Sequence, residues 1–323
     1  MANILFASNS ISHFPGTEIK TIAGNNSWEP FDSSRVPYAI YTVPNTEATS
    51  PEFTESTTTE TWAHCRFGVT FWDFNTSEQI FALYNDTTLI AQIFYRPSNG
   101  YEIKHEMDGQ SQSIFSFMPL QYELLRSMDI RVIHDSGNSR SELELYVNEI
   151  FMGKVDFIAS NIIKPNRLRI GNHKDGAYFS EIIVADGDTR NARLDLVVPV
   201  AEGHYKDWNG SLGALSDDDP TTGMTTTLAD QKQSTIMTAY GGASNISNVV
   251  QVTTSVRGIN SPDQLEHFLR MGAVDYTNPV PFDLTFSKEF QVTDWQINPA
   301  TSQPWTAADI AATEFGFGSK NST

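Results

Sequence analysis

Residues 128–147 read MDIRVIHDSGNSRSELELYV, and this stretch decides the fold class. A run of turn-forming residues at 135–138 separates two segments in which apolar side chains recur at every second position. A period of two is typical of a β-strand with one buried face and one solvated face. We therefore predict a hairpin whose second strand has a dry and a wet face. The dry face is Leu143, Leu145 and Val147, and the wet face is Glu142, Glu144 and Tyr146.

Similar segments lie on both sides of this hairpin, with turn residues between them. Two apolar runs at 79–84 and 88–95 join through Asn85-Asp86, which indicates a second hairpin. Short strands, frequent turns and the lack of a sustained helical pattern up to residue 185 predict a β-sandwich. The other strand candidates of this half are residues 63–74, 101–107, 155–158, 167–170 and 178–185.

The second half of the chain predicts a further set of strands and one short helix. Residues 264–276 fit either a helix or a strand, and we favour the strand. Thr306 precedes an alanine-rich segment and Asp309 follows three residues later, a pattern typical of a capped helix start. The clearer strand candidates are residues 194–200, 235–240, 249–256 and 282–290.

The polar run at 186–193 marks the predicted domain boundary. We expect an all-β protein with two β-sandwich, jelly-roll-like domains. The first is expected at residues 1–190, and the second, an assembly domain, at residues 191–323. A length of 323 residues is sufficient for two cores of this size.

Charge and cysteine content exclude several classes of partner. The net charge is −18, with 39 acidic and 21 basic side chains, and such a surface repels nucleic acid and anionic lipid. Cys65 is the single cysteine, so no intrachain disulfide exists. The first residues lack the pattern of a secretion signal, and no stretch has the length and hydropathy of a membrane span. We expect a protein made in the cytoplasm, with neither nucleic-acid binding nor membrane insertion.

Motifs between residues 62 and 186 follow one another in an order that points to a known fold. Asp129-Ile130-Arg131-Val132 precedes a glycine-bearing hairpin, and Leu145-Tyr146-Val147-Asn148 is similar to a YVNG-like strand and turn. The strand at residues 62–67 precedes these motifs, and the runs at 167–172 and 179–186 follow them. Together the motifs resemble those of a concanavalin-like sandwich of the laminin G or pentraxin type. Glu149 stands where glycine is usual, so we expect an opened or bulged turn.

Two further stretches carry a second resemblance. Residues 178–186 and the ending from 298 to 316 are similar to a family of tailed-phage virion proteins. This resemblance implies a structural component of a bacteriophage particle, either tail- or fibre-associated or capsid-decorating, located in the virion. Its partners would be other virion proteins and copies of itself, because virion components occupy symmetric positions. The alternative is a host-surface glycan-binding, receptor-binding module of a tail fibre or tail tip. No enzymatic activity is expected.

Acidic side chains suggest two kinds of chemistry. Glu142 and Glu144 share a strand face, as the acid and nucleophile of a glycoside hydrolase do, but the third acidic partner and the aromatic spacing of such enzymes are missing. A solvated strand face is favoured instead. A Ca²⁺ site is the second idea, since carboxylates are hard oxygen ligands. Its candidates are Asp217, Asp219, Asp186 and Asp188, but a solvated acidic loop is favoured and no cofactor is expected.

Aromatic residues near loops are the candidates for carbohydrate binding, which requires an exposed ring beside polar groups. They are Trp28, Trp72, Tyr101 and Trp208. Packing in a core or an interface is the competing and favoured explanation for each of them.

Cys65 beside His64 suggests a thiolate activated by an imidazole. Neighbouring residues on a strand point to opposite faces, however, so this pair is not expected to form that hydrogen bond. We predict that Cys65 is a small buried side chain.

Overall fold

The computed structural model describes residues 2–21, 31–69, 78–96, 100–107, 110–116, 126–158, 161–217, 219, 221–242 and 246–322. Within these ranges the chain is nearly all β, as predicted, and α1 (Ala307–Ala312) is the only α-helix. No helix in the same ranges has the length and hydropathy to cross a membrane.

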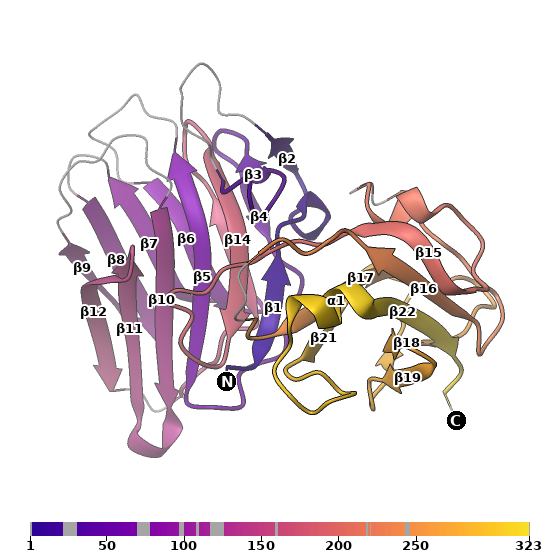
Figure 1. The fold of residues 1–323 in the computed structure, drawn as a ribbon. Helices are drawn as coiled ribbons and strands as arrows, with labels where there is room; N and C mark the ends of the chain where they lie inside the picture. Colours follow the sequence, from indigo (N-terminus) through magenta and orange to yellow (C-terminus); the bar gives the residue numbers. More distant parts are fainter. Residues whose placement is uncertain are drawn as a thin grey trace. The chain divides into compact units, whose positions relative to one another are not determined.

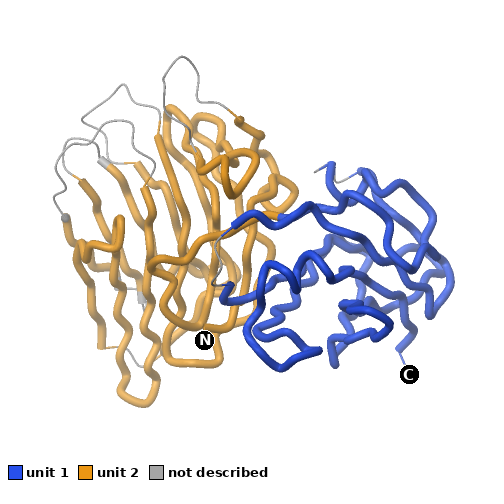
Figure 2. Tube along the Cα trace, in the orientation of Figure 1, with its two compact units in different colours: residues 1, 197–323 blue, residues 2–196 orange. Residues whose placement is uncertain are grey.

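Two compact units divide the chain, Ala2–Leu196 and Val197–Thr323 (Figure 2). The expected boundary, after residue 190, lies a few residues before the observed boundary between Leu196 and Val197. The intervening segment stays with the first unit because Arg193 binds Glu181 and Asp195 accepts hydrogen bonds from Arg35. Each unit is described below by itself.

The N-terminal unit contains, within the described ranges, an eight-stranded antiparallel sheet (Figure 1). Its order is β12-β11-β10-β5-β14-β3-β2, and β1 pairs with β14. The strands are β1 (Ile4–Ser8), β2 (Thr17–Lys20), β3 (Ala39–Thr42), β5 (Glu60–Val69), β10 (Arg126–Asp135), β11 (Arg140–Val147), β12 (Ile150–Ile158) and β14 (Ala177–Ala185).

A second sheet of the same unit has the order β4-β13-β6-β7-β8-β9. Buried apolar side chains of both sheets form one core, with Phe67 and Leu143 from the first sheet and Leu83 and Ile103 from the second. The unit is therefore a β-sandwich, as predicted. The strands of the second sheet are β4 (Glu47–Thr49), β6 (Glu78–Asn85), β7 (Thr88–Arg96), β8 (Gly100–Met107), β9 (Gln110–Ser116) and β13 (Arg167–Gly171).

The hairpin predicted from residues 128–147 is the pair β10-β11, with Met128 opposite Val147 and Asp135 opposite Arg140. Its apolar face is buried in the core, as predicted. The expected wet face is a correction, because Glu142 and Glu144 are also buried. Ion pairs with Arg131 and Lys154 offset the free-energy cost of removing the two carboxylates from water.

The turn between β11 and β12 is tight. Asn148 and Glu149 both have left-handed backbones, with φ of 48° and 67°, the combination that a two-residue hairpin loop requires. The turn at Glu149 is therefore neither opened nor bulged, contrary to the expectation. The irregularity lies inside the hairpin instead, where the register with β12 shifts between Leu145 and Tyr146.

The C-terminal unit also consists of facing sheets. The larger has the order β15-β16-β22-β18-β19, with β20 beside β18, and β17 and β21 form a two-stranded sheet. Residues 264–276 form a hairpin, which confirms the choice of strand over helix. The strands are β15 (Pro199–Lys206), β16 (Lys232–Met237), β17 (Val249–Ser255), β18 (Gln264–Met271), β19 (Val274–Thr277), β20 (Phe282–Asp283), β21 (Glu289–Trp295) and β22 (Thr313–Lys320).

Polar and apolar contacts join the two sheets of this unit. His267 on β18 bonds Thr253 and Thr293 of the small sheet, each at 2.8 Å. An apolar cluster adds the buried side chains Leu269, Trp305, Ile310 and Phe315. The predicted short helix is α1, and its start is a capping box in which Thr306 and Asp309 bond each other's backbone N–H.

Candidate functional site

The outer face of the eight-stranded sheet carries the side chains that sequence analysis had placed on the wet face of β11. Register sets them in rows across the strands. Trp62 on β5 lies opposite Arg131 on β10, which lies opposite Glu144 on β11 and then Lys154 on β12. The next row holds His64, Asp129, Tyr146 and Phe151.

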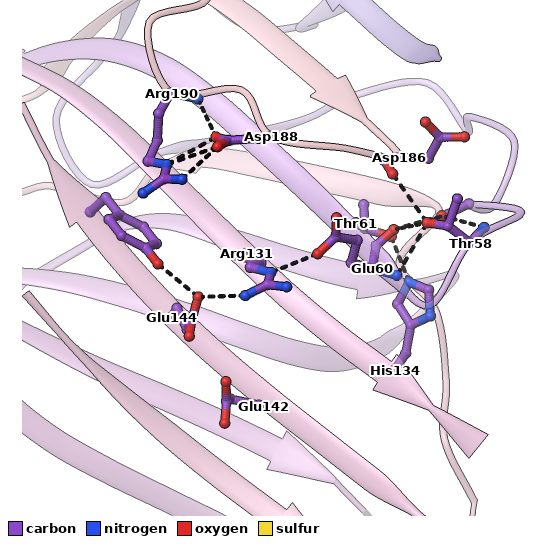
Figure 3. Close-up of polar contacts among 12 residues, drawn as sticks. Thr58, Glu60, Thr61, Arg131, His134, Glu142, Glu144, Asp186, Asp188 and Arg190 are labelled. Carbon is purple, nitrogen blue, oxygen red and sulfur yellow. Dashed lines mark hydrogen bonds and ion pairs between the residues drawn. The ribbon is translucent and has the colours of Figure 1, made fainter. Parts of the chain in front are cut away.

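Arg131 is at the centre of a charged network on this face (Figure 3). Its Nε donates to Glu60 Oε2 at 2.7 Å, and its Nη1 donates to Glu144 Oε2 at 3.1 Å. The same oxygen of Glu144 accepts the Tyr146 hydroxyl at 2.9 Å. Burial, together with this bond to a carboxylate, raises the pKa of Tyr146 to about 12. Tyr146 is therefore a fixed hydrogen-bond donor at neutral pH.

Glu142 is held by two cations. Its Oε2 accepts from Arg140 Nη2 at 2.5 Å and from Lys154 Nζ at 2.8 Å. Burial acts to raise the pKa of Glu142, but the hydrogen bonds from Lys154 and Arg140 outweigh it and hold the pKa below its usual range. An ionised carboxylate of this kind does not supply the proton that a general acid in glycoside hydrolysis must give.

A strap, residues 186–196, crosses the same face. Thr189 donates to Asp129 Oδ1 at 2.8 Å, and that oxygen is also 2.8 Å from Nδ1 of His64. At the end of the strap, Arg193 bonds both oxygens of the buried Glu181 carboxylate, at 2.6 and 2.9 Å. These contacts fasten the strap to β10 and β14.

Aromatic rings form a ladder from the strap to the edge of the sheet. Trp62 and Tyr146 stack with centroids 5.7 Å apart, and Arg190 of the strap lies over both rings. Phe151 meets Tyr146 edge-on at 5.5 Å and is 51% exposed. The ladder thus ends in an open ring beside charged groups, an arrangement that suits a sugar with an apolar face and polar edges.

Phe151 was not among the aromatic candidates from the sequence. Tyr101 was, but it is 1% exposed and packs against Phe67 and Tyr95, so its ring is not open to a ligand. Trp208 is half-buried, with Nε1 donating to Gln231 O and its ring edge-on to Phe317. The packing explanation therefore holds for Tyr101, whereas the half-buried Trp208 remains a candidate. Trp28 and Trp72 lie outside the described residues.

The aspartates considered for Ca²⁺ are each bonded to partners close by in the chain or beside a neighbouring strand. Asp186 accepts from Asn3 N, and Asp188 forms an ion pair with Arg190. In the C-terminal unit, Asp217 accepts from Thr222 and Asp219 accepts from Thr221. Among the described residues, no group of three or more His, Cys, Asp or Glu side chains is arranged to hold a metal ion.

Cys65 and His64 point to opposite faces of β5, as the strand pattern predicts. Cys65 is fully buried in the sandwich core, and burial raises the pKa of its thiol. His64 faces outward and bonds Asp129. Their side chains therefore do not form a thiolate–imidazole pair.

Comparison with known proteins gives distant likenesses. No family model and no curated protein matches the sequence. A botulinum neurotoxin type C structure, described as depending for cell entry on interaction with two ganglioside molecules, is 10% identical, with a TM-score of 0.39 over 95% of this chain and 94% of its own. The Ruminococcus gnavus IT-sialidase CBM40 is 13% identical, with a TM-score of 0.29 over 43% and 91%.

A sialidase gives a likeness of the same low level. It is 8% identical, with a TM-score of 0.35, and the match covers 62% of this chain but 22% of the sialidase. With identities and TM-scores as low as these, none of the three likenesses assigns a function to the chain.

Proposed function

We propose that the protein is a non-catalytic glycan-binding protein, and that the outer face of the eight-stranded sheet is its binding surface. The observation that carries the proposal is the open Phe151 ring at the end of the aromatic ladder. A sugar ring stacked on Phe151 would have polar groups nearby. Tyr146 lies in the same row of the sheet as Phe151, and Glu144 and Lys154 lie in the next row. Fixed donors and acceptors beside a stacking ring give a site its orientation and specificity.

Binding is favoured over hydrolysis because the carboxylates on this face already have partners. Glu142 is held by Arg140 and Lys154, and Glu144 by Arg131 and Tyr146. These bonds position the side chains for recognition, and Glu142, whose pKa lies below its usual range, is not suited to act as a general acid.

A glycan array with the full chain tests this proposal. We expect saturable binding to at least one glycan, and an affinity reduced about 5- to 10-fold by Phe151→Ala, since an aromatic contact is worth about 1 kcal/mol. Phe115→Ala is the matched control, because Phe115 is 60% exposed but lies on β9 of the other sheet. Equal losses in both variants, or no glycan bound by the wild type, would contradict the proposal.

We further infer that the chain assembles with copies of itself in a bacteriophage particle, through the C-terminal unit. Two neighbouring loops of that unit, held together by the bond from Arg257 N to Thr285 O, expose Ile259 and Phe286 to solvent. Large apolar side chains that are exposed on adjacent loops favour contact with another protein surface. One chain would then have both the assembly role, through the C-terminal unit, and the receptor-binding role, through the glycan-binding face of the N-terminal unit.

Two measurements test the assembly inference. Sedimentation of the full chain should give an oligomer that Ile259→Ser with Phe286→Ser converts to a monomer. Mass spectrometry of purified particles should detect the chain. A monomeric wild type contradicts self-assembly, and absence from the particles contradicts the virion location.

A further inference from the structure

The surface beside Phe151 presents cations while the carboxylate that holds them is hidden. Glu142 is 2% exposed, whereas its partners Arg140 and Lys154 are 48% and 43% exposed. Both cations bond the same oxygen, Oε2, so their nitrogens are held close together at the surface of the sheet.

One shared carboxylate does not neutralise two cations. Two further anions lie near them: Glu144, which is already bonded to Arg131 and Tyr146, and Asp156, whose carboxylate lies 3.7 Å from Lys154 Nζ and is itself 54% exposed. At that distance and exposure the attraction is weak and screened by solvent. The pair Arg140 and Lys154 therefore keeps the capacity to hold a second, external anion.

This cationic pair lies within reach of a ligand stacked on Phe151. Phe151 is opposite Tyr146, and Lys154 is opposite Glu144, which lies two residues from Tyr146 on the same face of β11. Two residues along a strand span about 7 Å. Arg140 contacts Glu142, which lies four residues from Tyr146, or about 13 Å along the strand. An anionic group held by both cations therefore belongs to another ring of an oligosaccharide than the ring bound at Phe151.

We propose that the glycan bound on this face is acidic, with its anionic group held between Arg140 and Lys154 and a sugar ring on Phe151. This inference rests on the proposed function and names the class of its ligand. Recognition by two charge-assisted hydrogen bonds fits a carboxylate, as in uronic or sialic acids, and also fits a sulfate. A net charge of −18 disfavours acidic ligands elsewhere on the surface, so the cationic pair would supply the specificity.

The test is titration calorimetry of the full chain with matched pairs of oligosaccharides that differ in one group. The pairs are a uronic acid oligosaccharide with its methyl ester, a sialylated glycan with its asialo form, and a sulfated glycan with its unsulfated form. We expect at least one acidic member to bind 10-fold or more tightly than its neutral partner, and raised salt to weaken that binding. The three pairs distinguish carboxylate from sulfate.

Three variants make the result specific to this pair. Arg140→Gln should remove most of the preference for the acidic member. Asp156→Asn should increase it, because the competing carboxylate is lost. Phe151→Ala should weaken the acidic and neutral members alike.

Equal binding of acidic and neutral partners, with both weakened by Phe151→Ala, would overturn the acidic ligand and leave the glycan-binding face standing. Failure of every glycan to bind would overturn both. A preference for acidic glycans that Arg140→Gln leaves unchanged would place the anion elsewhere and would also overturn the inference. Circular dichroism of each variant confirms the fold.

Discussion

Arg193 bonds both oxygens of the Glu181 carboxylate, and Glu181 is fully buried with a left-handed backbone at φ 52°. This pair fixes the strap against β14 at a bulge, where the register with β5 shifts between Ser180 and Ile183. The Glu181 amide is also engaged, since it donates to Asn9 at 3.0 Å. A buried carboxylate at a strained position needs a partner, so the strap depends on the guanidinium.

Arg193→Met keeps an unbranched apolar stem and removes the guanidinium and its charge. Glu181 then retains the Leu194 N–H and the distant Arg66, whose Nε is 3.7 Å away. We expect a loss of about 2–3 kcal/mol in the free energy of unfolding from urea denaturation, because an uncompensated buried charge is costly. Arg167→Met, which breaks an exposed pair with Glu52, is the control and should cost less than about 1 kcal/mol. Equal losses would show that the strap does not depend on Glu181.

Buried imidazoles make the protein sensitive to acid. Burial lowers the pKa of His13 and His267 to about 3 and that of His134 to about 4. An unfolded chain takes up protons on these residues near pH 6.5, so it binds more protons than the folded chain below that pH. Stability should be fully present above pH 6.5 and fall progressively as the pH approaches 3–4.

His267→Gln tests this account in one place, because glutamine forms hydrogen bonds but does not titrate. Thermal unfolding is measured at pH 7 and pH 4.5 for both proteins. The melting temperature of the wild type should fall further from pH 7 to pH 4.5 than the melting temperature of His267→Gln does. The same loss in both would mean that His267 does not contribute to the acid sensitivity.

Gly316 on β22 has no room for a side chain. A Cβ there would lie 2.2 Å from the ring of Phe268, which is fully buried. Gly316→Ala should therefore destabilise the C-terminal unit by about 1–3 kcal/mol, the usual cost of overpacking. Gly223→Ala, where a Cβ would meet nothing within 4 Å, should change stability by less than about 0.5 kcal/mol. A harmless Gly316→Ala would contradict the close packing of Phe268 on β22.

Local patterns predicted the parts of this structure that depend on neighbouring residues in the chain. Alternation placed Leu143 and Leu145 in the core and turned Cys65 and His64 to opposite faces. The hydroxyl and carboxylate of Thr306 and Asp309 predicted the start of α1. Each of these depends on a strand or helix period that is visible in the sequence.

The candidate site was predicted in part, because it depends on strand order and register. Alternation placed Glu142 and Glu144 on one face of β11. Their burial depends on partners on the two neighbouring strands, Lys154 on β12 for Glu142 and Arg131 on β10 for Glu144. Phe151 faces Tyr146 because the two-residue turn at 148–149 places Val147 opposite Ile150 and Tyr146 opposite Phe151, and the shift beyond this pair brings Lys154 opposite Glu144. The turn was expected to be opened or bulged, so this pairing and the open ring were missed and the buried Tyr101 was chosen.

The most direct test of the glycan-binding face is a crystal structure of the full chain with the tightest glycan from the array. We predict a sugar ring against Phe151, with polar contacts to Tyr146, Glu144 or Lys154. A glycan bound on any other surface, such as beside Trp208, with Phe151 left uncovered, would contradict the account.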